Sequence, residues 1–96
     1  MKTIYKYEVP LQDSSEILMP QGAKILSVQE QRGRPQIWAL VDRANKPEAR
    51  KFVLKGTGHE ADGVEYMQFI GTVQIGQYVF HLFEDAGPFA FIAKHI

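Results

Sequence analysis

The chain has 96 residues, of which 45% are hydrophobic and 23% charged, and its eleven basic and eleven acidic side chains cancel. A neutral chain has no long-range field that attracts nucleic acid or an anionic membrane, so an anion site has to be a local cluster. The lack of cysteine excludes disulfides, thiolate metal ligands and cysteine nucleophiles. No segment approaches the roughly 20 apolar residues of a membrane span. We therefore expect a single cytoplasmic domain over residues 1–96, and we expect no direct contact with a membrane or with nucleic acid.

The chain begins with apolar and polar residues in alternation, which is the pattern of half-buried β-strands. Residues 2–9 place tyrosines and a valine on one face and charged side chains on the other, and Pro10 ends this strand. A polar turn at 11–15 then leads to a short strand at 16–20.

The next part of the chain has the pattern of a β-hairpin. Residues 23–31 and 36–42 form its strands, and residues 32–35 (RGRP) form its turn, because glycine accepts a positive φ and proline fixes the re-entry. Residues 36–42 (QIWALVD) are apolar on both faces, which predicts a central strand covered on two sides.

The second half continues in the same pattern. A polar loop at 43–49, where Pro47 allows at most one turn of helix, leads to a strand at 50–56. A second hairpin spans residues 66–84 on either side of Ile75-Gly76. Gly71 lies inside one of its strands and predicts a bulge or a sharp bend.

The last residues, 85–96, are mostly apolar and are expected to add a strand or to serve as an oligomerisation tail. No stretch shows a convincing helical period over ten residues. The predicted fold is therefore mostly β: a small antiparallel barrel or a two-layer sandwich of six to eight strands, with at most one short helix.

The stretch KGTGHEADG at residues 55–63 concentrates glycines and polar groups. Glycine-rich loops bind phosphate because backbone N–H groups converge on its oxygens. The order of residues matches neither a Walker motif nor a dinucleotide fingerprint. A weaker hypothesis is that Lys55, the Thr57 hydroxyl and His59 surround an anion.

Two other interpretations of this stretch stand beside it. A metal site is disfavoured, because no paired-histidine or H-x-E spacing is present. A local structural role is favoured: Asp62 and Glu65 have the spacing of a capping box, which predicts a strand exit followed by one helical turn at 62–67.

No catalytic constellation is found in the sequence, so we expect a protein that is not an enzyme and needs no cofactor. The three serines lie outside any nucleophile elbow. Glu84 and Asp85 are adjacent in a predicted solvated turn and point apart. His81, between two apolar residues of a strand, is predicted to be partly buried with its hydrogen bonds satisfied.

Arg32 and Arg34 flank the tip of the first hairpin. Arginines at such a tip usually serve solubility, but they can also capture phosphate or carboxylate in a bidentate manner. Aromatic side chains, which in β-proteins are core residues more often than ligand platforms, could stack on a base where two subunits meet. The aromatic candidates are Trp38, Tyr5, Tyr7, Tyr66 and Tyr78. The predicted ligand-binding residues are Arg32, Arg34, Trp38, Lys55, Thr57 and His59.

Exposed strand edges and the apolar tail also predict self-association, as a β-paired or tail-swapped homo-oligomer.

The order of motifs MKTIYKYEV, MPQGAKILSVQEQRGRPQIWALVD, GTGHE, FIGTVQ and YVFHLFE resembles a family of short proteins encoded by phages and bacteria, often linked to prophages and described as a domain of unknown function. The resemblance covers about residues 1–84. It implies a phage-associated accessory role in the host cytoplasm and carries over no catalytic residue.

Two functional hypotheses follow. The first is a homo-oligomeric binding protein for a small anionic ligand, such as a nucleotide signal of bacterial immunity. The alternative is a protein-interaction module that docks on a host protein, for instance inhibiting a defence nuclease through a sheet edge.

Overall fold

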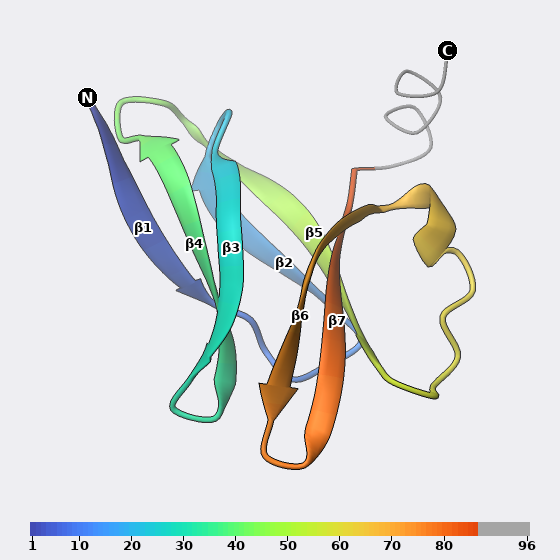
Figure 1. Ribbon diagram of the computed structural model, residues 1–96. Coiled ribbons are helices and arrows are strands. Elements are labelled where there is room, and N and C mark those ends of the chain that lie inside the picture. The colour runs from blue at the N-terminus through green and yellow to red at the C-terminus, as the bar shows by residue number, and fades with distance from the viewer. Residues whose placement is uncertain (87–96) are drawn as a thin grey trace.

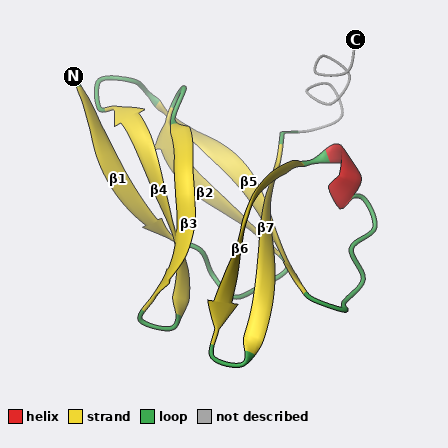
Figure 2. Ribbon diagram, viewed as in Figure 1, coloured by secondary structure: helices red, strands yellow, loops and turns green. Residues whose placement is uncertain are grey.

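The computed structural model describes residues 1–86, which form antiparallel β-strands in two sheets that pack face to face (Figures 1 and 2). The predicted all-β fold is confirmed, and of the two alternatives the structure is the two-layer sandwich. A single 3-10 turn is the one helical element in this range, in agreement with the prediction. The seven strands are β1 (Lys2–Glu8), β2 (Ser14–Pro20), β3 (Lys24–Gln31), β4 (Arg34–Asp42), β5 (Pro47–Gly56), β6 (Gln68–Ile75) and β7 (Tyr78–Asp85), and the 3-10 turn is η1 (Val64–Tyr66).

The first sheet has the order β1-β4-β3, so that β4 is central as predicted. Its inward side chains, Ile37, Ala39 and Val41, are fully buried. Trp38 and Leu40 on the other face are half-buried, because no second layer of the described chain covers that face. The prediction of a strand covered on both sides is therefore wrong for the outer face.

The turn of the β3–β4 hairpin is shorter than predicted. Arg32 and Gly33 both have positive φ values, 57° and 77°, and form a two-residue turn whose twist suits a hairpin. Gln31 pairs directly with Arg34. Arg34 and Pro35 consequently belong to β4 and not to the turn, although Arg32 and Arg34 do flank the tip as expected.

The second sheet has the order β2-β5-β7-β6. β2 and β5 pair along their whole length, from Ser14 opposite Val53 to Pro20 opposite Pro47. This pairing supplies hydrogen-bond partners for backbone N–H and C=O groups in stretches that the sequence analysis had placed in loops. The predicted turn at 11–15 therefore ends earlier, and Pro47 begins a strand, a position that proline tolerates, and not a helical turn.

The core lies between the two sheets. The bulge predicted at Gly71 is confirmed, because the register of β6 against β7 shifts between Phe69 and Gly71. A Cβ atom on Gly71 would lie 2.8 Å from Val28 Cγ1. Gly71 thus allows β6 to lie beside β3 of the other sheet (Figure 1). The largest fully buried side chains of the core are Phe52, Met19, Ile37, Leu82, Val9 and Val41.

The predicted helical turn exists, but its cap differs from the prediction. Its N-cap is Gly63 with φ 95°, and no side chain caps it. Glu65 does reach back, since its Oε1 accepts the Gly63 N–H at 2.8 Å. Asp62 does not cap the turn, because glycine occupies the cap position with a positive φ that favours glycine.

Glu84 and Asp85 end β7 and do not form the predicted solvated turn. As predicted, they point to opposite faces. Glu84 faces the gap between the sheets and pairs with Arg50, while Asp85 lies 3.9 Å from Lys51 Nζ on the outer face. Residues 87–96, on which the additional strand or tail was expected, lie outside the described residues. No helix within residues 1–86 is long and apolar enough to cross a membrane.

Candidate functional site

The glycine-rich stretch leaves the end of β5 in a tight turn, which confirms the predicted strand exit. The Thr57 N–H donates to the Val79 carbonyl at 2.9 Å, and the His59 N–H donates to the Gly56 carbonyl at 3.1 Å. The His59 ring folds back over Gly56, where a Cβ atom would lie 3.0 Å from His59 Nδ1. Gly56 therefore provides the space in which the imidazole lies.

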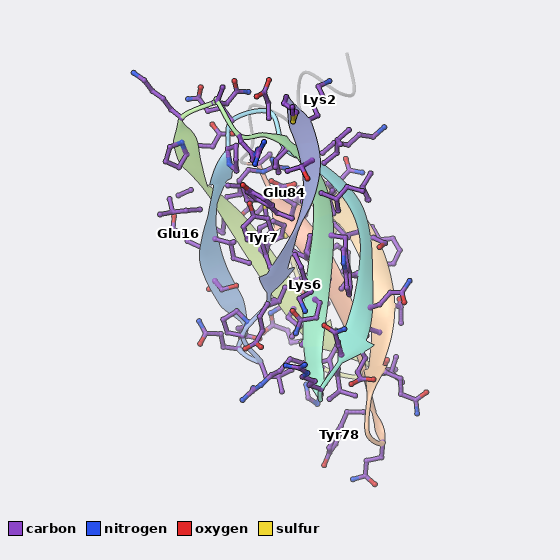
Figure 3. All side chains as sticks on the ribbon, turned by 90° about the vertical axis from the view of Figure 1, so that its left-hand side faces the viewer. Lys2, Lys6, Tyr7, Glu16, Tyr78 and Glu84 are labelled. Atoms are coloured by element: carbon purple, nitrogen blue, oxygen red, sulfur yellow. The ribbon has the colours of Figure 1, made fainter. Side chains whose placement is uncertain are left out.

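This turn forms one wall of an open pocket with a volume of about 380 Å³. The other wall is the β6–β7 hairpin, whose Tyr78 ring is 61% exposed. Tyr78 lies at the tip of this hairpin (Figure 3), with its ring centroid 6.4 Å from that of Phe80. The pocket thus offers an aromatic surface beside an imidazole, and its lining residues are Gly56, Thr57, His59, Gln77, Tyr78, Val79 and Phe80.

Thr57 also belongs to a hydrogen-bonded row that crosses the second sheet. Its Oγ1 lies 2.7 Å from His81 Nε2, and Thr72 Oγ1 lies 2.9 Å from His81 Nδ1. Because a hydroxyl can donate or accept, both ring nitrogens are satisfied in either tautomer. The prediction of a partly buried, satisfied His81 is confirmed, and the row ties the loop to β6 and β7.

Lys55 lies beside this row, opposite His81 in the β5–β7 pairing. Its side chain is only 17% exposed, and its Nζ lies 3.6 Å from Asp13 Oδ1. The Asp13 side chain is 85% exposed. A lysine side chain that is mostly buried therefore has as its counter-ion a carboxylate that water surrounds, and such a weakly held carboxylate can be replaced by an incoming anion.

The structure divides the six predicted ligand-binding residues into two groups. Lys55, Thr57 and His59 lie together at the end of β5. Arg32 and Arg34 lie on the tip of the β3–β4 hairpin, at the same end of the molecule but in the other sheet (Figure 1). Within residues 1–86 no hydrogen bond or ion pair engages either guanidinium.

Trp38, the sixth predicted residue, lies along β4 on the outer face of the first sheet. It pairs with Lys6 of β1 and Ser27 of β3. Trp38 is therefore not part of the pocket beside the 56–59 loop.

Several contributors to this region could not be selected from the sequence. Tyr78 was one of several aromatic candidates, and nothing in the pattern distinguished it from Tyr66. Thr72 and His81 share a row only because β6 and β7 pair in the shifted register that follows the bulge. Asp13 reaches Lys55 from the loop before β2, a contact between residues far apart in the sequence.

A second pocket, of about 290 Å³, lies where the start of β3 meets β5 and β6. Arg50 and Glu84 line it, and the hydrogen bond with the Glu84 carboxylate raises the pKa of Arg50. The charges of Arg50 and Glu84 compensate each other, and Lys24 at the start of β3 also lines this pocket. No group of three or more side chains in residues 1–86 is arranged to hold a metal ion.

One family model matches this chain: the domain of unknown function DUF7352, over residues 1–90. The match confirms the expected relationship to a domain of unknown function and shows no association with phages. No curated protein and no solved structure matches the chain.

Proposed function

The chain belongs to the DUF7352 family, and we propose that it is a non-enzymatic protein that binds a small anionic ligand between the 56–59 loop and the β6–β7 hairpin. The observation that carries this proposal is the pairing of Lys55, whose side chain is mostly buried, with the exposed Asp13 carboxylate. The carboxylate occupies the position that an anionic group of a ligand would take. Thr57 connects this position to the pocket, because it lines the pocket and lies next to Lys55 on the outer face of the sheet.

A ligand with both a charged and a flat part fits this arrangement. Its anionic group would replace Asp13 at Lys55 on the outer face, and the ligand would pass Thr57 into the pocket that His59 lines. Its flat part would stack on the exposed Tyr78 ring, since every nucleobase has a face that an aromatic side chain can cover. The pocket volume lies at the lower end of the range for small-molecule sites. These features support a nucleotide as the ligand class.

The resemblance to short phage and prophage proteins suggests where such binding would matter. A small protein without catalytic groups could sequester a nucleotide signal of bacterial immunity. The proposed site contains Lys55, Thr57 and His59, and it does not require Arg32, Arg34 or Trp38.

The Thr57–His81–Thr72 row has the contacts of a nucleophile and a base, but the surroundings favour binding over catalysis. The second ring nitrogen of His81 contacts the neutral hydroxyl of Thr72, which does not stabilise an imidazolium as a carboxylate would. The N–H groups of Thr57 and His59 are already bonded to carbonyls and cannot form an oxyanion hole. The bound nucleotide is therefore expected to be recovered unchanged.

Isothermal titration calorimetry against mononucleotides, cyclic nucleotides, cyclic dinucleotides and pyrophosphate tests the proposal. Loss of one charge-assisted contact, in Lys55→Met or His59→Ala, is expected to weaken binding about tenfold or more. Lys51→Met is the matched control, because Lys51 lies on the same face of β5 and also pairs with an acid. Its affinity is expected to stay within about twofold of the wild type.

Two outcomes would overturn the proposal. The first is that none of these compounds binds to the wild-type protein. The second is that Lys55→Met and His59→Ala both keep the wild-type affinity while remaining folded. Mass spectrometry of the recovered nucleotide checks the non-enzymatic part, which a hydrolysed product would contradict.

A further inference from the structure

We propose that β1 pairs antiparallel with β1 of a second copy of this chain, which joins two three-stranded sheets into one continuous sheet. This inference goes beyond the ligand site and does not depend on it. β1 is an edge strand, and within residues 1–86 no strand pairs with its free side. Figure 3 views the molecule from this side, with Lys2 near the start of β1 and Lys6 further along. A long unpaired edge is a template for another strand.

The other sheet edges are less suited to this pairing. β3 and β6 lie beside each other, so each faces its neighbour from the other sheet. β2 ends at Pro20, which cannot donate a hydrogen bond. A two-fold pairing of β2 centred on Ile17 would place Pro20 opposite Ser14 of the partner subunit, with no opposite charges facing each other. β1 contains neither proline nor a bulge.

The charges of β1 select one register. A two-fold axis perpendicular to the sheet must pass through a residue that pairs with its own copy, because opposed side chains have to share a face. Centring on Ile4 places Lys2 opposite Lys6 of the partner subunit, and centring on Lys6 places two copies of Lys6 opposite each other. Centring on Tyr5 pairs the whole strand and places Lys2 opposite Glu8 of the partner subunit, twice by symmetry.

The same register suits the inward face of the strand. Tyr5, which is 39% exposed, would lie opposite its own copy, and Thr3 opposite Tyr7 of the partner subunit. Aromatic and β-branched pairs of this kind stabilise antiparallel sheets. The Tyr5 and Tyr7 rings already contact edge to face at 6.4 Å, so the pairing would extend an existing aromatic cluster across the two-fold axis.

Charge reversal tests the register in solution. Sedimentation equilibrium over a concentration series is expected to show a dimer for the wild type. Glu8→Lys and Lys2→Glu each place like charges opposite one another and should weaken the dimer about tenfold. An equimolar mixture of the two variants restores opposite charges in both pairs and should dimerise about as tightly as the wild type. A folding defect could not be repaired by mixing.

Glu8→Lys is the cleaner of the two variants, because Glu8 lies opposite the neutral Gln36 within the sheet, whereas Lys2 lies opposite Asp42. Thermal melts of both variants check that the subunit still folds. A wild type that stays monomeric at all concentrations would overturn the proposal. Unchanged dimerisation in both single variants would overturn it too, as would a mixture no more dimeric than its components.

Cysteine cross-linking tests the register independently, because the chain contains no cysteine. In the register centred on Tyr5, Tyr5→Cys brings two Cα atoms to roughly 4.5–5.5 Å, within the range that a disulfide spans. Two copies of Ile4→Cys would have Cα atoms about 8 Å apart, too far to be bridged. Oxidation should therefore cross-link Tyr5→Cys and not Ile4→Cys. The reverse result, or no cross-link in either variant, would overturn the proposed pairing.

Discussion

The guanidinium of Arg50 and the carboxylate of Glu84 face each other in the gap between the two sheets through two hydrogen bonds. Arg50 Nε lies 2.5 Å from Glu84 Oε2, and Nη2 lies 2.9 Å from Oε1. The third nitrogen, Nη1, donates to the Ala23 carbonyl at 2.6 Å. The ion pair thus connects β5 and β7 of the second sheet to the residue that precedes β3 of the first sheet.

Removal of one partner of this pair is expected to destabilise the protein. The side chains of Arg50 and Glu84 are only 16% and 14% exposed, so Glu84→Gln would leave a largely desolvated charge without a counter-ion. We expect a loss of about 2–3 kcal/mol in the free energy of unfolding, less than for a fully buried pair. Urea denaturation measures this loss.

The double variant Arg50→Met/Glu84→Leu serves as the control for the ion pair. Two apolar side chains leave no unpaired charge, and the double variant should recover most of the stability that Glu84→Gln loses. If Glu84→Gln is as stable as the wild type, the pair does not hold the sheets together in the way described.

The contact between Gly71 and Val28 predicts a second effect on stability. Gly71→Ala would place a methyl group 2.8 Å from Val28 Cγ1, and overpacking of this kind costs about 1–3 kcal/mol. Val28→Ala removes the obstructing methyl groups. In a double-mutant cycle measured by urea denaturation, Gly71→Ala should therefore lower the free energy of unfolding much less in the Val28→Ala background than in the wild type. Equal costs in both backgrounds would show that the two residues do not constrain each other.

The fold was predictable because alternation and turn residues are local signals. The central position of β4 followed from its apolar residues, and the bulge followed from one glycine within a strand. Pro47 and Ser14 were misassigned because long-range pairing of β2 with β5 overrides their turn propensity. The same limit applies to the site: Lys55, Thr57 and His59 are neighbours in the sequence, whereas their contacts with Asp13 and His81 depend on tertiary structure.

The backbone of Arg32 predicts that its replacement can stabilise the protein. Arg32 is the one non-glycine residue with a positive φ, 57°, among residues 1–86, and asparagine is favoured over arginine at this turn position. Arg32→Asn should raise the free energy of unfolding by about 0.5–1 kcal/mol. Arg34→Asn makes the same arginine-to-asparagine change on β4, at a residue whose φ is not positive, and should not stabilise the protein. A gain of equal size in both variants would indicate a charge effect and not relief of the backbone.

Asp42 predicts a dependence of stability on pH. The Ala44 N–H, which donates to Asp42 Oδ1 at 3.0 Å, lowers the pKa of this carboxyl below its ordinary value of 3.8, with help from the N-terminal ammonium and Lys2. Because the folded state holds the proton less tightly than the unfolded state, this stabilisation is present above pH 3.8 and is lost as the pH falls through the lowered pKa. Asp42→Asn should flatten the decline of stability in this acidic range. An unchanged slope in thermal melts across the range would contradict the assignment.

Tyr78 predicts a direct test of ligand stacking, which rests on the proposed function. Tyr78→Ala should weaken nucleotide binding about tenfold or more, because base stacking on an aromatic ring contributes about 1–3 kcal/mol. Tyr66→Ala is the matched control, since Tyr66 is 58% exposed against 61% for Tyr78 but lies in η1 and does not line the pocket. Pyrophosphate, which has no base, should bind equally to the wild type and Tyr78→Ala. If Tyr78→Ala weakens both ligands equally, the ring shapes the pocket without stacking on a base.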